Sequence, residues 1–112
     1  MNKQRRKELY AIQNRLYNIS STDKETVDIK SIQGELEDIK SDLECLYYEE
    51  EAYMDNIPEN LQNSSRYEAA EDACDNLESA VDSIDDAISS DDFEDIVDAI
   101  EDAINYIDEA TM

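Results

Sequence analysis

The chain has no histidine and no tryptophan, and its 112 residues include one glycine, one proline and two cysteines. Without histidine there is no Ser/His/Asp set and no Cys/His pair for nucleophilic catalysis, and two cysteines alone do not make a structural zinc site. A single glycine leaves no phosphate-binding loop, and one glycine with one proline gives little turn chemistry for a β-sheet. We therefore expect a protein that is not an enzyme and that holds no metal and no cofactor.

Positive charge is nearly absent from the second part of the chain. Residues 1–40 carry eight Lys or Arg and seven Asp or Glu, whereas residues 41–112 carry one cation, Arg66, against 24 carboxylates. The net charge of −22 argues against direct binding to DNA, RNA or an anionic membrane. A rigid array of carboxylates instead resembles a nucleic-acid backbone, so we expect a basic nucleic-acid-binding protein as the partner.

Long hydrophobic runs are also missing. No apolar stretch approaches the ~20 residues that a transmembrane helix needs. No apolar stretch follows the basic residues near the N-terminus, as a secretory signal would require. Two cysteines without an export signal suit a reducing cytosol, so the sequence predicts a cytoplasmic protein.

Apolar residues recur at helical spacing in four segments, and the first two occupy residues 3–19 and 22–54. Thr22 and Glu25 have the spacing of a capping box, so the second helix is expected to begin there. This helix keeps a heptad pattern over more than three heptads, as a coiled coil does, with Glu50 as the one interruption. The expected seams are Leu9, Ile12, Leu16 and Ile19 in the first helix and Ile29, Ile32, Leu36, Ile39, Leu43, Leu46 and Tyr53 in the second.

A third helix is expected to follow a second capping box, formed by Ser65 and Glu68. Its pattern changes phase at residues 89–92. Either one kinked helix continues there, or a new helix begins with Asp91 and Glu94 as its cap, and we expect the break. The expected seams are Ala70, Cys74, Leu77, Val81, Ile84 and Ile88 before the break and Phe93, Val97, Ile100, Ile104 and Ile107 after it.

The only clear loop spans residues 55–63 and contains Pro58, which disfavours helix at the residue before it. The long second and third helices are therefore expected to form an antiparallel hairpin, with Ile57 and Leu61 closing its end. The shorter outer helices fold back on this hairpin. The sequence thus predicts an all-α fold, a small antiparallel helical bundle with coiled-coil character and three to four helices. Residues 1–112 are expected to form a single helical domain, as a monomer or a homodimer.

Cys45 and Cys74 lie at equal distances from the expected centre of the hairpin, so they are predicted to be level on facing helices. One interpretation is a disulfide or a redox switch. The preferred one is two half-buried thiols in a reducing cell. The acidic segment 82–95 lacks the glycine and the ligand spacing of a calcium loop, so no specific calcium site is expected.

Seventeen carboxylates lie between Glu68 and Glu109, and no lysine or arginine follows Arg66. They recur at i, i+3, i+4 and i+7, which places a charge every ~3–5 Å along a helix axis. Two such helices side by side approach the duplex value of about one charge per 1.7 Å. The interpretations are a solvated acidic face, or a nucleic-acid mimic with the partner-binding residues Glu68, Glu71, Asp72, Asp75, Glu78, Asp82, Asp85, Asp86, Asp91, Asp92, Glu94, Asp95, Asp98, Glu101 and Asp102.

Tyrosine is the dominant aromatic residue, with seven copies against one phenylalanine. Tyrosine suits an edge that is part buried and part wet, and it is common at interface hot spots. Four tyrosines near the hairpin end either pack the end of the bundle or extend the partner-binding surface: Tyr47, Tyr48, Tyr53 and Tyr67.

A cluster of cations opens the first helix, formed by Lys3, Arg5, Arg6 and Lys7. Cations at this end oppose the helix macrodipole, so a neutralising group is expected nearby. Acids of the fourth helix are the expected source. A partner protein, or a separate anion-binding patch, is the alternative.

Residues 55–88 carry a resemblance to a known group of proteins. The run Asn-Ile-Pro-Glu-Asn-Leu-Gln, followed by Arg-Tyr-Glu-Ala-Ala-Glu-Asp-Ala, resembles a segment of small acidic proteins of phages and prophages of Gram-positive bacteria. In size and charge the chain also resembles phage anti-restriction and anti-CRISPR proteins that mimic DNA. The resemblance brings no functional residues with it. It implies a phage-encoded inhibitor in the cytoplasm of the host cell.

Two functions from different classes are therefore expected. The first is an inhibitor whose acidic face blocks the basic nucleic-acid channel of a host defence nuclease, with an RNA-guided nuclease as one candidate. The alternative is a coiled-coil structural or assembly protein. Its apolar seam would be shared between chains, and its acidic surface would only give solubility.

Overall fold

Four α-helices and one short 3₁₀ helix make up the computed structural model, which describes residues 1–62 and 64–112. The helices are α1 (Lys3–Ser20), α2 (Ile29–Asp55), α3 (Ser65–Ile88) and α4 (Phe93–Ala110), with η1 (Glu59–Leu61) between α2 and α3. The residues that the structure describes contain no strand. The predicted all-α fold and the predicted break between the last two helices are confirmed.

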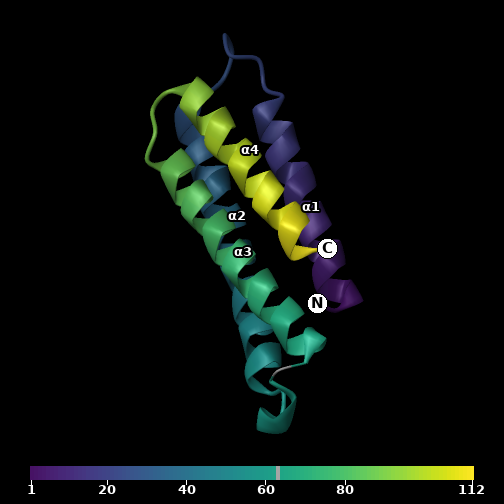
Figure 1. Cartoon of the computed structure of the whole chain (residues 1–112). Helices are drawn as coiled ribbons and strands as arrows, with labels where there is room; N and C mark the ends of the chain where they lie inside the picture. The colour runs from purple at the N-terminus through teal and green to yellow at the C-terminus, as the bar shows by residue number, and fades with distance from the viewer. Residues whose placement is uncertain (63) are drawn as a thin grey trace.

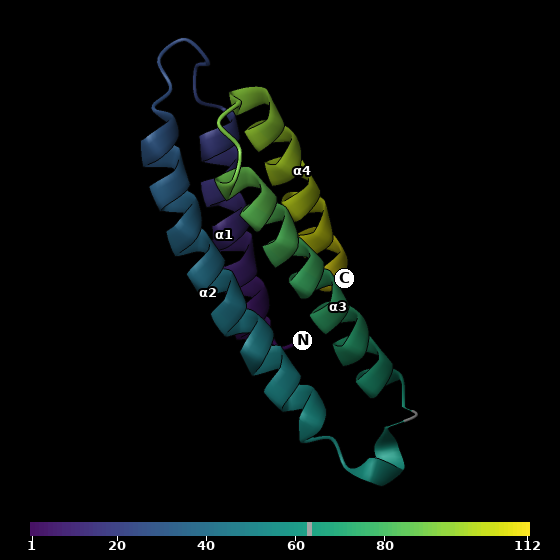
Figure 2. The ribbon, with the colours of Figure 1, turned by 90° about the vertical axis from the view of Figure 1, so that its left-hand side faces the viewer.

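The helices run alternately up and down in an elongated bundle of 55 × 22 × 18 Å (Figure 1). The α1–α2 and α3–α4 connections lie at one end, and the α2–α3 connection lies at the other (Figure 2). α2 and α3 are the longest helices, with 27 and 24 residues. Their hairpin therefore extends past the outer helices, and both chain termini lie part-way along it.

Each helix contributes one apolar stripe to a shared core. Burying a large apolar side chain stabilises a fold by about 1.5–3 kcal/mol. The stripes predicted for α1 and α2 are confirmed, except that Ile29 and Tyr53 are half buried. The fully buried large apolar residues are Leu9, Leu16, Leu36, Ile39, Leu43, Leu77, Ile84, Ile96, Ile100 and Ile107.

The buried stripes of α3 and α4 are rich in alanine, a feature that the predicted seams missed. Small side chains let two helices approach closely, and α3 with α4 makes the most extensive contact of any helix pair. Ile96 is fully buried, whereas Val81, Ile88, Phe93 and Val97 are half buried. A helix in a globular core buries a wider stripe than the narrow seam of a coiled coil. The additional buried alanines are Ala73, Ala80, Ala87, Ala103 and Ala110.

α2 begins later than predicted. Asp28 is its N-cap, and the carboxylate accepts hydrogen bonds from two backbone N–H groups of the first turn, at 3.1 and 3.4 Å. The predicted capping box of Thr22 and Glu25 is wrong, because the Thr22 hydroxyl donates to the Asn18 carbonyl of α1 at 3.3 Å. The connection between α1 and α2 therefore spans residues 21–28.

The caps of α3 and α4 are each one residue away from the predicted position. Ser64 rather than Ser65 caps α3, accepting a backbone hydrogen bond from the first turn at 3.3 Å. Asp92 rather than Asp91 caps α4, accepting one from the Glu94 N–H at 2.9 Å. In both places two polar residues compete for one cap, and their spacing alone does not select between them.

The turn predicted after Pro58 is present as η1, where the Leu61 N–H donates to the Pro58 carbonyl at 2.8 Å. Ile57 is buried, as expected for a residue that closes the hairpin end. The same prediction is wrong for Leu61, which is 49% exposed. The reason is that η1 lies beyond the ends of α1 and α4, so no outer helix covers it (Figure 2).

Candidate acidic interface

The carboxylates of α3 and α4 lie on the outward sides of two neighbouring helices. Along α3, Leu77 and Ile84 face the core, whereas Asp75 and Asp82 on the opposite side are exposed. The same alternation holds along α4. Sixteen of the seventeen predicted carboxylates are exposed, and Asp85 is half buried. The structure thus brings the predicted acidic residues together on one side of the bundle.

Charge repeats densely along both helices. Eight carboxylates lie on α3 between Glu68 and Asp86, and seven lie on α4 between Glu94 and Glu109. A rise of 1.5 Å per residue gives about one carboxylate every 4 Å on each helix. Because α3 and α4 lie side by side (Figures 1 and 2), their combined spacing comes near the value of ~1.7 Å per charge in duplex DNA.

Lysines neutralise only a small part of this face. Within the described residues, two of the seventeen carboxylates form ion pairs: Asp85 with Lys40 at 2.6 Å, and Glu94 with Lys24. In each pair the hydrogen bond to the carboxylate raises the pKa of the lysine above its ordinary value. Both lysines therefore stay charged, and the other fifteen carboxylates have no ion-pair partner among the described residues.

Repulsion within the face is concentrated around Asp98. Its neighbours at i−4, i−3, i+3 and i+4 are Glu94, Asp95, Glu101 and Asp102, which are all exposed. Each like-charge pair at this spacing destabilises a helix by roughly 0.2–0.5 kcal/mol. A cationic partner surface would relieve this repulsion.

The four predicted tyrosines do not share one environment. Tyr47 and Tyr48 form an edge contact with ring centroids 5.3 Å apart, and the Tyr47 hydroxyl donates to Glu51 at 2.9 Å. This hydrogen bond, together with burial, raises the pKa of Tyr47 to about 12. Tyr53 instead lies under the Arg5 guanidinium of α1. Tyr67 is half buried in the first turn of α3. Of the four, only Tyr48 is largely exposed, at 60%.

Three exposed tyrosines were not singled out from the sequence. Tyr10 and Tyr17 lie on α1 and Tyr106 lies on α4. The spacing of seven residues between Tyr10 and Tyr17 places both on one face of α1. This spacing could have indicated a shared face in the sequence. Two tyrosines without further apolar residues around them do not, however, predict an exposed aromatic surface.

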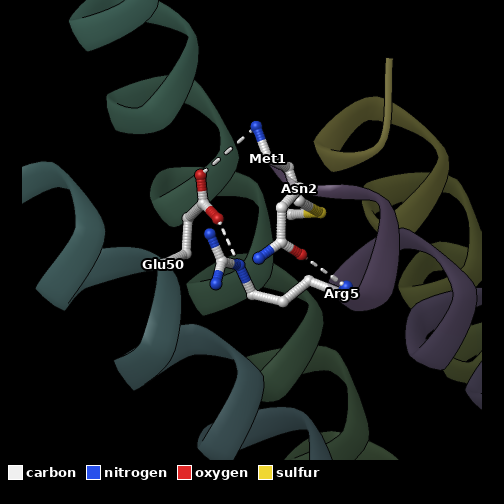
Figure 3. Close-up of polar contacts among 4 residues, drawn as sticks. All are labelled: Met1, Asn2, Arg5 and Glu50. Atoms are coloured by element: carbon white, nitrogen blue, oxygen red, sulfur yellow. Dashed lines mark hydrogen bonds and ion pairs between the residues drawn. The ribbon is translucent and has the colours of Figure 1, made fainter.

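Glu50 of α2 pairs with one cation of the N-terminal cluster, Arg5, and with the α-ammonium of Met1. The Arg5 Nε donates to Glu50 Oε2 at 2.8 Å, and the α-ammonium of Met1 lies 3.6 Å from Glu50 Oε1 (Figure 3). Asn2 caps α1, accepting a hydrogen bond from the Arg5 N–H at 2.8 Å. The prediction of a neutralising acid on the fourth helix is wrong, because Arg5 points inward to the fully buried Glu50. The sequence did contain a signal for this pair: Glu50 is a carboxylate at a heptad position of α2 that faces the core.

Cys45 and Cys74 are free thiols and are not level. The Lys40–Asp85 pair sets the register of α2 against α3, and it places Cys74 near Glu50. The prediction assumed a symmetric hairpin, whereas the two helices are staggered. Burial raises the pKa of the Cys74 thiol to about 12, and the charge of Glu50 adds to the effect. Cys45 is exposed, so the prediction of two half-buried thiols is wrong for both residues.

Within the described residues, no group of three or more His, Cys, Asp or Glu side chains is placed to hold a metal ion. In the same part of the chain, no helix combines the length and the apolar character that crossing a membrane requires. Comparisons with protein-family models, with curated proteins and with solved structures found no match. The resemblance of residues 55–88 to phage proteins therefore stays a prediction.

Proposed function

We propose that the protein inhibits a basic nucleic-acid-binding protein by presenting the outward carboxylates of α3 and α4 in place of a nucleic-acid backbone. The proposed target is a host defence nuclease, with an RNA-guided enzyme as the first candidate, and the proposed source is a phage. One observation carries the proposal. All but one of these carboxylates lie exposed, and among the residues that the structure describes lysines pair with only two of them.

The packing of α3 against α4 supports this proposal, because it makes the acidic surface rigid. Buried alanines and isoleucines hold the two helices in extensive contact. A preorganised surface loses little conformational entropy when a partner binds. Opposite charge also speeds the encounter with a basic channel, and this effect weakens as salt is raised.

A coiled-coil assembly protein is the rival class, and it needs an apolar seam that is free for another chain. Here the stripes of all four helices meet in one core within a single chain. The large apolar side chains that remain exposed in the described chain are spread over several elements, and Tyr10 and Tyr17 are the two that share a helix: Tyr10, Tyr17, Tyr48, Leu61, Tyr106 and Met112. This distribution favours the inhibitor over the assembly protein.

The test is capture of a nucleic-acid-binding enzyme from host lysate on the immobilised protein, at low and at raised salt. We expect a nuclease that binds at low salt, is released as salt rises, and is displaced by competing DNA or guide RNA. Inhibition of that nuclease by the purified protein is then measured directly. Capture of copies of the protein alone, or of other phage proteins, would favour the assembly role.

Two charge-matched variants sharpen this test. The first neutralises six carboxylates of the acidic face: Asp82→Asn, Asp85→Asn, Asp86→Asn, Asp95→Asn, Asp98→Asn and Asp102→Asn. The second neutralises six exposed carboxylates of α2 and its preceding connection: Glu25→Gln, Glu35→Gln, Glu37→Gln, Asp38→Asn, Glu49→Gln and Asp55→Asn. We expect the first variant to lose inhibition with its helix content intact and the second to keep it. Retained inhibition in the first variant would overturn the proposal.

A further inference from the structure

α1 differs from the other three helices in charge and in packing. It carries five cations and one carboxylate, a net charge of +4, whereas residues 29–110 carry three cations and 27 carboxylates, a net charge of −24. Its contacts with α2 and α4 are less extensive than the contacts of α3 with those two helices. α1 is thus a basic amphipathic helix that lies on an acidic body formed by α2, α3 and α4.

The body holds α1 in an apolar groove with polar contacts on both rims. On the α4 rim, the Gln13 Nε2 donates to the Ile104 carbonyl at 3.1 Å and to Asp108 at 2.7 Å. On the α2 rim, the Arg15 guanidinium donates to Asp42 at 2.7 Å. The α1 side chains that fill the groove between these rims are Leu9, Ile12, Leu16 and Ile19.

The rims of this groove are hollowed at the surface beside α1. An open hollow of about 320 Å³ lies between α1 and α2, lined in part by Ala11, Asp42 and Cys45. A second hollow of about 560 Å³ lies at the N-terminal end of α1, beside Arg5 and Tyr53. Both hollows leave room for side chains larger than those that α1 supplies.

Glu50 is an independent sign that a different helix would fit the groove better. Its side chain is fully buried and points at α1, and its Oε2 accepts the hydrogen bond from Arg5 (Figure 3). Its Oε1 accepts no hydrogen bond from the described residues and lies 3.6 Å from the Met1 α-ammonium, beyond hydrogen-bond distance. A buried carboxylate oxygen without a donor at hydrogen-bond distance is unfavourable. An arginine that presents two parallel N–H groups would satisfy both oxygens at once.

We propose that this groove binds a basic amphipathic helix of another protein in place of α1. The partner helix sets an arginine against Glu50 and apolar residues at the spacing of the α1 stripe. α1 occupies the groove until that helix arrives, and the connection at residues 21–28 keeps it attached. Apart from Asp108, which lies on the α4 rim, this site is separate from the acidic face of the proposed function, because the groove lies under α1 and the rest of the face points outward.

The connection at residues 21–28 determines how tightly a partner helix must bind in order to displace α1. A short connection holds α1 at an effective concentration on the order of 1 mM, so a partner helix has to match the groove better than α1 does. Cutting the connection removes this advantage without removing any residue. A cut chain therefore reports the affinity of the groove itself.

The test uses the full chain with a specific protease site inserted after Glu25 and cut. A fluorescein-labelled peptide of residues 1–20 is titrated against it, and fluorescence anisotropy is followed. We expect saturable binding, release of the cut α1 in equal amount, and at least about tenfold weaker binding to the uncut chain. Absence of exchange, with the cut protein still folded by circular dichroism, would overturn the proposal.

Matched peptides separate the groove from general charge attraction. The Arg5→Ala peptide is expected to bind at least about tenfold more weakly, because the buried Glu50 loses its donor. The Lys7→Ala peptide loses the same charge at an exposed position and is expected to bind like the unmodified peptide. Equal loss in both peptides would overturn the proposal. Neutralising Asp82 and Asp98 on the acidic face is expected to leave peptide binding unchanged.

Hydrogen exchange on the uncut protein gives a second measurement in case the cut chain unfolds. We expect the amides of α1 to exchange faster than those of α2, α3 and α4, since a displaceable helix opens before the body does. Protection of α1 equal to that of the body would contradict the proposal.

Discussion

α1 and α4 have the same length, 18 residues, and each buries one apolar stripe in the same core. Their charges are opposite: α1 has a net charge of +4, and α4 carries seven carboxylates and no cation. Both segments form complete helices although one is basic and the other acidic. The spacing of their apolar residues is therefore sufficient for folding, whatever the sign of the charge on the solvent side. The charge on the solvent side is therefore free to serve recognition, and on α3 and α4 it has a single sign.

The position of a charge decides what it contributes. Glu50 is fully buried and holds Arg5, so its contribution is to stability. Asp98 is exposed among four other carboxylates, so its effect on stability is small and unfavourable. Changes at the buried pair are therefore expected to have the largest effects on stability, and changes at exposed charges the smallest.

Removing the buried carboxylate is expected to have the largest effect. Glu50→Ala leaves Arg5 charged and unpaired in a buried site, which should lower the free energy of unfolding by about 3–5 kcal/mol. Urea unfolding followed by circular dichroism measures the change. Glu49→Ala removes the same charge from the exposed neighbour and should shift stability by less than about 0.5 kcal/mol. Similar losses in both variants would show that burial does not distinguish the two sites.

Alkaline pH should destabilise the protein through Cys74. Its pKa rises from the ordinary value of 9.0 to about 12 in the fold. Stability from the neutral thiol is therefore complete below pH 9, and it is lost as pH rises toward 12, by up to about 1.4 kcal/mol per pH unit.

The two cysteines provide a matched pair for this measurement. Cys74→Ala is expected to flatten the dependence of the unfolding free energy on pH between 9 and 12. Cys45→Ala, at the exposed thiol, should keep the slope of the unmodified protein. An unchanged slope in Cys74→Ala would mean that the thiol is not shielded from water.

Reversing one charge on the acidic face should stabilise the protein. Asp98→Lys converts four repulsive pairs into attractive ones, for a gain of about 2 kcal/mol. Asn14→Lys on the exposed side of α1 adds a cation whose i±3 and i±4 neighbours are uncharged, so no gain is expected from such pairs. Thermal midpoints at low and raised salt provide the comparison. A gain for Asp98→Lys that survives raised salt would argue against electrostatic repulsion as its cause.

The smallest effect is expected from an exposed ion pair of α1. The Arg15 and Asp42 side chains are 37% and 58% exposed. A double-mutant cycle of Arg15→Ala and Asp42→Ala should therefore give a coupling energy of only about 0.2–1 kcal/mol. A coupling as large as the loss in Glu50→Ala would remove the distinction between buried and exposed pairs.

The sequence predicted the existence of the helices better than their ends. Periodic apolar residues such as Leu9 and Leu36 identified the stripes of α1 and α2, because periodicity depends only on helix geometry. Thr22 was wrongly assigned as a cap, because its hydroxyl could bond either forward or back and bonded back to α1. Local spacing does not decide between two such hydrogen bonds.

The candidate site shows the same division. The sequence identified every carboxylate of the acidic face, since acids opposite an apolar stripe must point outward. It did not identify Glu50 as the partner of Arg5, nor the stagger that separates Cys45 from Cys74. Both depend on which residues of another helix lie opposite, and no pattern within one helix contains that information.

What the sequence by itself determined is the set of helices, the side of each that enters the core and the sign of the charge on the other side. These follow from a period of 3.6 residues and from the unfavourable burial of unpaired charge. The tertiary structure alone decided the register of α2 against α3, the close approach of α3 and α4 over small residues, and the burial of Glu50 against α1. The physical reason is that each of these contacts joins residues distant in the chain, and its free energy exists only once both helices have packed.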